Sequence, residues 1–389
     1  MSSVSQTLRG PSRVGAWVVL ALAAAVVLVV LAKLGARLYR DEAMWALAGW
    51  TMPGDFGVFL RASEDVLHGT NPYPAPSESI EPPLAPYAYP PFLALAIAPF
   101  TLLPVSVAQT SWTLFGIGAI VAALLVLDVR DWRCHAVALL NPFTRDALEY
   151  GALGPVLLLL IAVSWRYRDR VWPPAACLGA SIVLKLFLAP FLLWLAMTRR
   201  IGAAVLGGVL AVAVLVLSWA AIGLDGLGDY PGLLRRLTDL EAENSYSAFA
   251  LLQALGLPSA AARAAAVLGG LALLVLAYRA ARSSATADER DRRSLLLMLA
   301  AVLVLTPILW LHYLVLLLVP LALTRPRLSA LWLVLLVPTV FLWLGWYEGW
   351  AAGSLRALVS VAATAAVVLA GCLLGRGARL PARAATGAA

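Results

Sequence analysis

Residues 201–223 read IGAAVLGGVLAVAVLVLSWAAIG, a run without a charged side chain. About 20 apolar residues in a helix cross the hydrocarbon core of a bilayer, so this run predicts a membrane-spanning helix. Across its 389 residues the chain is 62% hydrophobic and 13% charged, with a mean hydropathy of +0.87, which excludes a soluble globular domain. We expect an all-α polytopic membrane protein with further spans in the apolar runs at 15–34, 260–280, 294–309, 312–324, 328–347 and 352–374.

The positive charges predict how the chain is threaded through the membrane. The net charge is +8, but the arginines form short clusters between apolar runs, which favours the positive-inside rule over a nucleic-acid-binding face. The run 15–34 follows Arg9 and Arg13 without a small-residue cleavage site, so we expect an uncleaved first span. The cytoplasmic side is expected to hold the connections 128–133, 166–170, 199–200, 279–293 and 324–327 and the tail 376–389. The loop 35–90 is expected on the opposite side.

The number of crossings between residues 90 and 200 stays open, because several apolar runs there are too short to cross alone. We prefer 91–103 as a re-entrant or interfacial segment, with 172–183 and 184–197 as separate crossings. The alternative makes 91–103 a span and 172–197 a single span, which would place the arginines of 166–170 outside. Either arrangement gives about 12 transmembrane helices in one domain, 1–389, with extracytoplasmic loops and a juxtamembrane helix.

Asp55 is the polar residue with the most informative position. It opens the run Gly54-Asp55-Phe56-Gly57-Val58-Phe59-Leu60 within the long loop, which continues through prolines and aromatic residues to Tyr87-Ala88-Tyr89-Pro90-Pro91. Prolines and aromatic rings of this kind can build a shaped pocket around a carboxylate. Asp55 is either the N-cap of an amphipathic helix or a catalytic carboxylate, and the two roles are compatible because a cap uses one oxygen.

Two cationic residues, Lys185 and Arg145, have either a structural role in an ion pair or a functional role in binding an anion. Lys185 lies in an apolar run, where an ammonium pairs with Asp146 or Glu149 or meets an anion such as phosphate. Arg145 either binds an anion or pairs with one of the same two acids.

His312 lies where two apolar runs meet, beside Trp310 and Tyr313. We expect it to contact a phosphate or a sugar hydroxyl, whereas the aromatic neighbours alone would fit a membrane-interface belt. Asn141 and Asn244 are residue types that more often cap helices than bind ligands.

Motifs for other chemistries are missing from the sequence. It has no Walker loop, Rossmann glycine pattern, HExxH or nucleophile elbow, so no nucleotide cofactor is expected. Cys134, Cys177 and Cys372 lie in or beside apolar stretches and form no metal or redox motif. No metal site is expected.

The order of these polar islands resembles glycosyltransferase family 87, a group with the GT-C fold. The likeness runs from about 50 to 320 and rests on a set of short motifs: Asp55-Phe56, Gly69-Thr70-Asn71-Pro72-Tyr73, Tyr89-Pro90-Pro91, Asn141-Pro142, Gly151, Lys185, Asn244-Ser245-Tyr246-Ser247, Thr306-Pro307, Trp310, His312 and Tyr313. The chain departs from many relatives at Gly151-Ala152, where they place a glutamine after the glycine.

The resemblance implies an inverting glycosyltransferase in the plasma membrane that uses no nucleotide sugar. Its expected partners are a polyprenyl-phosphate-mannose donor, a lipid-linked glycan acceptor and membrane lipids, with the active site on the extracytoplasmic side. Asp55 would be the general base, and Lys185 and His312 would touch the donor phosphate. Tyr89, Arg145, Asn244, Trp310 and Tyr313 are the other candidate substrate-binding residues. The alternatives are an arabinosyltransferase with a polyprenyl-phosphate-arabinose donor, or a non-catalytic transporter of lipid-linked sugars.

Overall fold

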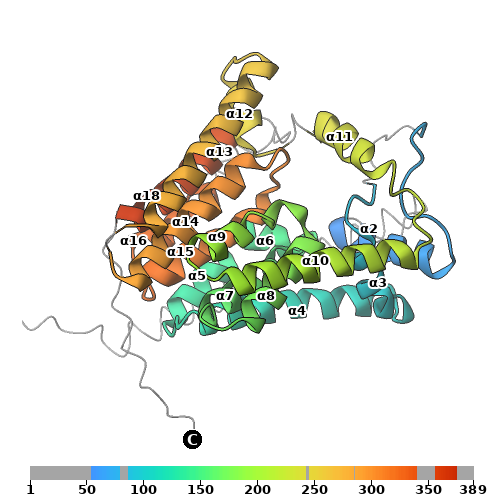
Figure 1. The fold of residues 1–389 in the computed structure, drawn as a ribbon, viewed down its shortest axis with the longest axis horizontal. Helices are drawn as coiled ribbons and strands as arrows, with labels where there is room; N and C mark the ends of the chain where they lie inside the picture. The colour runs from blue at the N-terminus through green and yellow to red at the C-terminus, as the bar shows by residue number, and fades with distance from the viewer. Residues whose placement is uncertain (1–53, 79–85, 242–244, 284, 340–354, 375–389) are drawn as a thin grey trace, which may run out of the picture. The chain divides into compact units, whose positions relative to one another are not determined.

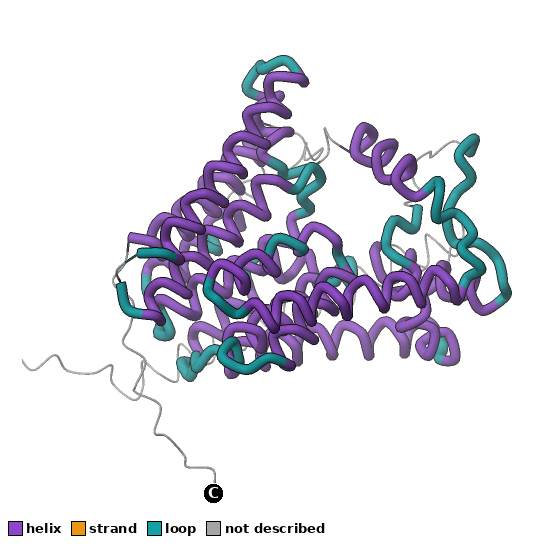
Figure 2. The backbone as a smooth tube through the Cα atoms, viewed as in Figure 1, coloured by secondary structure: helices purple, strands orange, loops and turns teal. Residues whose placement is uncertain are grey.

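A computed structural model describes residues 54–78, 86–241, 245–283, 285–339 and 355–374, all within the compact unit Gly54–Ala389. In these ranges every regular element is a helix, which Figure 2 shows and which confirms the all-α prediction for this part of the chain. The expected first span, 15–34, and the tail 376–389 lie outside the described residues. The helices labelled in Figure 1 and the short 3-10 segments between them are α2 (Gly54–Leu67), α3 (Pro91–Ile97), η1 (Ala98–Leu102), α4 (Val105–Val126), α5 (Trp132–Leu140), α6 (Pro142–Glu149), α7 (Gly154–Arg166), α8 (Trp172–Leu184), η2 (Leu186–Leu188), α9 (Phe191–Met197), α10 (Ile201–Ala221), α11 (Tyr230–Glu241), α12 (Ala248–Ala254), α13 (Ser259–Ala281), α14 (Ala287–Leu305), η3 (Leu311–Leu317), α15 (Leu318–Thr324), α16 (Ala330–Val334) and α18 (Leu355–Leu374).

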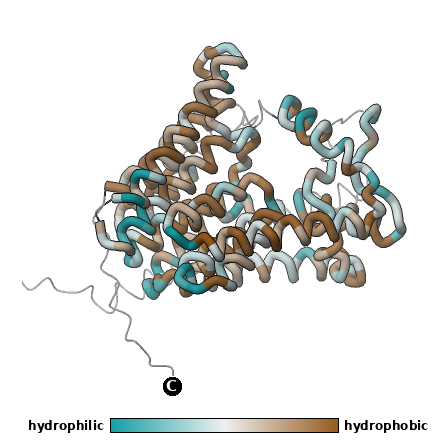
Figure 3. The backbone as a smooth tube through the Cα atoms, in the orientation of Figure 1, coloured by the Kyte–Doolittle hydropathy of each residue, from teal (hydrophilic) through white to brown (hydrophobic). Residues whose placement is uncertain are grey.

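Among the residues that the structure describes, four helices are long and apolar enough to cross a membrane: α4, α10, α13 and the Ala357–Leu374 part of α18. The pair α6 and α7, bent by 117°, would make a fifth if it forms one broken span. In Figure 3, α10 is among the most hydrophobic helices, and its side chains Val205, Val212 and Leu217 are more than half exposed. A helix that is apolar on its exposed face suits contact with lipid. The structure therefore supports a polytopic membrane protein, while a total of 12 spans stays a prediction.

Helices α8 and α10 pack closely and run in the same direction. A Cβ on Gly179 of α8 would lie 3.0 Å from the carbonyl oxygen of Gly207 on α10, and Ala175 is in contact with the same glycine. One to two turns further along, Ile182 of α8 packs against Ala211 of α10. Small residues let the two backbones approach, as is usual between membrane helices.

The segment from α8 to α9 is a helical hairpin with Lys185 at its turn. Arg168, before α8, and Arg200, after α9, both bind the same carboxylate oxygen of Asp291, so the two ends of the segment lie together. The 13 residues of α8 rise about 20 Å, which is shorter than the hydrocarbon core of a bilayer. A single span over 172–197 does not fit this hairpin. The two runs that were expected to cross separately form its two legs, and each leg is shorter than a membrane-spanning helix.

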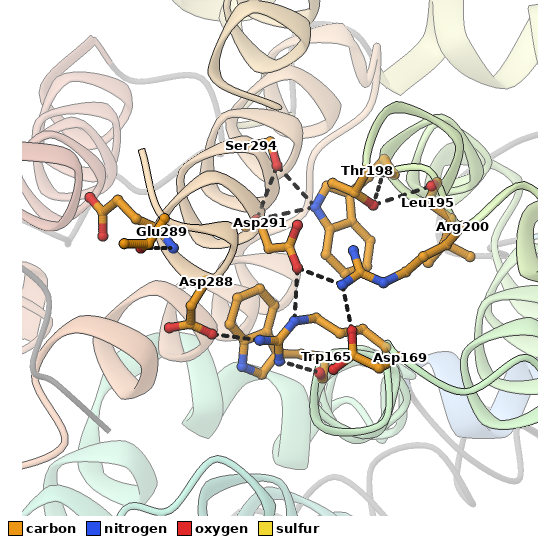
Figure 4. Close-up of polar contacts among 12 residues, drawn as sticks. Trp165, Asp169, Leu195, Thr198, Arg200, Asp288, Glu289, Asp291 and Ser294 are labelled. Atoms are coloured by element: carbon orange, nitrogen blue, oxygen red, sulfur yellow. Dashed lines mark hydrogen bonds and ion pairs between the residues drawn. The ribbon is translucent and has the colours of Figure 1, made fainter. Parts of the chain in front are cut away.

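Charged residues from three connections meet at the base of this hairpin. Asp291 Oδ2 lies 3.0 Å from Arg168 Nε and 2.6 Å from Arg200 Nη2. Asp288 binds Arg168, and Asp169 lies 2.7 Å from Arg200. Figure 4 shows Arg200 in contact with both Asp291 and Asp169, and Asp288 nearby. We call these five residues the ion-pair network.

The other expected cytoplasmic connections lie at the same end of the protein. Arg166, at the end of α7, pairs with Asp128 after α4 at 3.5 Å. The Asp131 carboxylate accepts a hydrogen bond from the backbone N–H of Leu328 at 3.0 Å. The arginine-rich connections from 128 to 328 thus gather together, as the charge pattern predicted.

The opposite end of α10 carries an aromatic cluster. The Trp219 ring stacks on Tyr73 with centroids 5.1 Å apart, and Tyr230 of α11 packs on both rings. The Tyr230 hydroxyl donates to the carbonyl of Ala88 at 2.9 Å. Because α10 spans from Arg200 to this cluster, the loop that contains Tyr73 and Ala88 lies at the end of α10 away from the ion-pair network.

Candidate active site

Asp55 lies in the first turn of α2, whose first residue is Gly54. The start of this helix is docked on the turn after α6, because the Phe56 N–H donates to the Tyr150 carbonyl at 3.1 Å. Gly54 has φ +86°, and a Cβ there would approach the Tyr150 carbonyl oxygen to 2.8 Å. Gly151 has φ +62°, and its Cβ would lie 2.6 Å from that of Phe56. Two glycines thus set the position of the carboxylate, and the positive end of the helix dipole favours its charge.

Tyr89 holds the Asp55 carboxylate from the other side. Its hydroxyl donates to Asp55 Oδ2 at 3.0 Å, and its own carbonyl accepts from the Tyr73 hydroxyl at 2.8 Å. Burial raises the pKa of the Tyr89 phenol well above its ordinary value, and the charge of Asp55 adds to the effect. The phenol therefore stays protonated and acts as a donor to Asp55. The predicted site residue Tyr89 is thus in direct contact with the candidate base.

Lys185 reaches the same place from the tip of the hairpin. Its Nζ lies 3.9 Å from the centroid of the Tyr89 ring and 5.0 Å from that of Tyr313, both cation–π distances. Its charge and that of Asp55 also attract each other. Within the described residues Lys185 makes no ion pair with Asp146 or Glu149, so the pairing that the sequence left open is not formed.

His312 lies between two carboxylates. Its Nδ1 is 3.1 Å from Asp146 Oδ2, and its Nε2 is 3.8 Å from Asp55 Oδ2. The imidazole is almost fully buried, whereas the Asp55 side chain is 24% exposed and so accessible to a ligand. Nε2 has no hydrogen-bond partner among the described residues.

Asp146 was not predicted as a site residue. Its contact with His312 joins positions 166 residues apart, so the sequence alone considered it only as a partner of Lys185 or Arg145. Helix α6 places it there: the Asn141 side chain accepts from the N–H groups of Phe143 and Thr144, which confirms the expected cap. Arg145 pairs with Glu149 at 3.5 Å and is 45% exposed, and no described contact joins it to Asp55, Lys185 or His312.

Of the remaining candidates, Tyr313 and the backbone of Trp310 lie beside His312. Tyr313 is buried, and its ring is 4.5 Å from that of His312. Trp310 precedes η3, and its carbonyl accepts from the Tyr313 N–H at 3.1 Å. Asn244 lies outside the described residues, but the Tyr246 N–H donates to the Leu309 carbonyl at 2.7 Å, which brings this segment next to η3.

The site therefore combines a reachable carboxylate with a buried imidazole and an ammonium. The described contacts of Asp55 use Oδ2, which leaves Oδ1 to meet a ligand. The carboxylate can accept a proton, and Lys185 and His312 can stabilise an anion. No cluster of three His, Cys, Asp or Glu residues suited to a metal occurs in the part of the chain that the structure describes.

The model of glycosyltransferase family 87 matches residues 87–307. The chain belongs to this family. The match includes Tyr89, Asp146 and Lys185, whereas Asp55 precedes its first residue and His312 follows its last. The resemblance in the sequence is thereby confirmed.

Curated relatives of this family-87 chain come from mycobacteria. It is 27% identical over 260 residues to the polyprenol-phosphate-mannose-dependent alpha-(1-2)-phosphatidylinositol mannoside mannosyltransferase of Mycolicibacterium smegmatis, a match that covers 59% of each protein. The Mycobacterium tuberculosis protein of the same name is 28% identical over 161 residues, 34% of this chain and 38% of the relative. An alpha-(1->3)-arabinofuranosyltransferase of M. smegmatis is 28% identical over 160 residues, 38% of this chain and 36% of the relative. No solved structure matches the chain.

Proposed function

We propose that this family-87 protein is an inverting mannosyltransferase that moves mannose from polyprenyl-phosphate-mannose to a lipid-linked glycan. The observation that carries the proposal is the convergence of Asp55, Tyr89, Lys185 and His312 from four separate elements. The M. smegmatis mannosyltransferase that matches over 260 residues is named for dependence on polyprenol-phosphate-mannose, which supports this donor.

The proposed reaction is a single displacement at the anomeric carbon. Asp55 takes the proton of an acceptor hydroxyl as that oxygen bonds to the sugar carbon. The bond from the same carbon to the phosphate oxygen breaks, and the electron pair leaves with the polyprenyl phosphate. Lys185 and His312 stabilise the charge that develops on this leaving group. Inversion requires one basic carboxylate, and Asp55 is the acid in this group that is not engaged in holding an imidazole nitrogen at hydrogen-bond distance.

We further propose that the site faces the extracytoplasmic side of the plasma membrane. Support comes from the position of the arginine-rich connections, which gather at the end of α10 away from the loop of Tyr73 and Ala88. The positive-inside rule assigns such connections to the cytoplasm. A lipid-linked donor and acceptor would then reach Asp55 from the outer leaflet.

A transfer assay with the full chain in detergent or vesicles tests the function. The expected result is a new glycosidic bond when polyprenyl-phosphate-mannose and a glycolipid acceptor are supplied. Loss of this activity is expected in Asp55→Asn, and Glu64→Gln serves as the matched control, because Glu64 is an exposed acid on the same helix. Movement of lipid-linked sugar across vesicles without a new bond would favour the transporter alternative.

The arabinofuranosyltransferase among the relatives favours a second candidate donor. A polyprenyl-phosphate-arabinose donor would use the same base and the same phosphate contacts and differ only in the sugar pocket. Supplying both donors in one assay at equal concentration separates the two, since the product mass reports which sugar is transferred.

A further inference from the structure

Asp146 has no role in the displacement as described, yet it makes the closest polar contact to His312. The two side chains meet at 3.1 Å between Asp146 Oδ2 and His312 Nδ1. The Asp146 side chain is 23% exposed and that of His312 only 5%. A contact of this kind on a buried imidazole fixes both its rotation and the nitrogen that carries the hydrogen.

The backbones on both sides of this contact are held in place. Helix α6, which carries Asp146, begins at Asn141-Pro142 with two side-chain hydrogen bonds to its first turn. The backbone of His312 packs on the start of α7, where a Cβ on Gly154 would lie 2.7 Å from the His312 carbonyl oxygen. The contact therefore joins two fixed elements and does not depend on a mobile side chain at the surface.

We propose that Asp146 is a positioning residue that accepts a hydrogen bond from the Nδ1–H of His312 and so directs Nε2 toward Asp55. When Nε2 also carries a hydrogen, it donates to the departing phosphate. An ionised carboxylate only accepts hydrogen bonds, so the 3.1 Å contact requires the Nδ1–H. Nε2, buried and without a hydrogen-bond partner among the described residues, is then the nitrogen that meets a ligand. Its place 3.8 Å from Asp55 Oδ2 puts it beside the carboxylate that receives the acceptor's proton.

The charged and titratable groups around the imidazole come from several elements. Asp55 faces it from α2 and Asp146 from α6, and Tyr313 follows it in η3. Lys185 lies beyond Tyr313, over the ring of that tyrosine. The effect of this positioning on sugar transfer rests on the proposed function, whereas the orientation of the His312 ring is independent of that function.

Nuclear magnetic resonance of the full chain labelled with ¹⁵N-histidine tests the orientation directly. The sequence has three histidines, so His312→Gln identifies the signals of this ring. The expected result is a proton on Nδ1 of His312 with a strongly downfield resonance. In Asp146→Leu the share of rings with hydrogen on Nδ1 should fall, and in Asp146→Asn, a weaker neutral acceptor, the Nδ1 proton should move upfield. His312 without an Nδ1 proton in the wild type, or with an unchanged signal in both variants, would overturn the proposal.

Kinetics then test whether the positioning matters for transfer. Partners that orient a functional histidine are worth about tenfold to a hundredfold in activity, so Asp146→Leu should lower kcat/KM by that amount. In the His312→Gln background the same change should have no further effect, whereas a merely structural role would lower activity by its full factor again. Asp146→Glu should recover part of the activity, and Asp239→Asn, at an exposed acid of α11, is the control with unchanged activity. A wild type that transfers no sugar would refute the proposed function and leave the resonance result standing.

Discussion

Replacing Asp291 with asparagine should destabilise the helical bundle more than any other single change in the ion-pair network. The Asp291 side chain is 9% exposed, and its Oδ2 serves both Arg168 and Arg200, whose side chains are 12% and 17% exposed. Removing one partner of a buried ion pair costs about 3–5 kcal/mol. Each arginine keeps a second, exposed acid, Asp288 or Asp169, and such pairs contribute about 0–1 kcal/mol each. We therefore expect a loss at the lower end, about 3 kcal/mol.

Equilibrium unfolding in mixed micelles, followed by tryptophan fluorescence, measures this loss. Asp288→Asn is the matched control, because it removes an acid that is 52% exposed and should cost no more than about 1 kcal/mol. The hairpin that carries Lys185 is closed by Asp291, so the donor KM should also rise in Asp291→Asn and not in the control. Equal and small losses in the two variants would refute the view that this network holds the hairpin.

Three further predictions concern the site. Tyr89→Phe removes the hydrogen bond to Asp55 but keeps the ring under Lys185, so kcat should fall about tenfold with little change in donor KM in steady-state assays; a change in KM alone would contradict this. Gly151→Ala forces a side chain into a left-handed backbone conformation at φ +62°, which costs about 1–2 kcal/mol of stability, and the new Cβ also clashes with Phe56 of α2. Thermal unfolding should show this loss. Gly118→Ala is the control, because a Cβ there meets no neighbour within 4 Å. Transfer activity should survive treatment with a chelator such as EDTA; loss of activity that a divalent ion restores would contradict the expectation of a reaction without an obligatory metal.

The general character of the site could be predicted from the sequence because rare residue types in an apolar chain are informative. Asp55, Lys185 and His312 were singled out as polar groups that are costly near a membrane, and Tyr89 by its place among prolines and aromatic residues. The structure brings all four together. The sequence could not predict which acid pairs with which base, because such pairing depends on rotation of helices about their axes. Asp146 is therefore not predictable as a site residue from the sequence, whereas the pairing of Arg145 with Glu149 is one of the two alternatives that the sequence offers.

The gathering of the charged connections at one end of the protein was predictable from the sequence. The clustering of the connections near Asp128, Arg168, Arg200 and Asp291 follows the positive-inside pattern. The path between residues 90 and 200 could not be predicted, because hydropathy does not distinguish a short crossing helix from one leg of a hairpin. The ion pairs of Arg168 and Arg200 with Asp291 show that the chain turns back at Lys185.

The central claim is that Asp55 accepts the proton of the attacking hydroxyl, and single-turnover transfer by Asp55→Asn tests it most directly. Donor binding should be measured in the same preparation, so that loss of chemistry is separated from loss of affinity. The account predicts donor binding close to that of the wild type and transfer reduced by at least about a hundredfold, the lower bound for a general base. Transfer by Asp55→Asn at a near wild-type rate would contradict it.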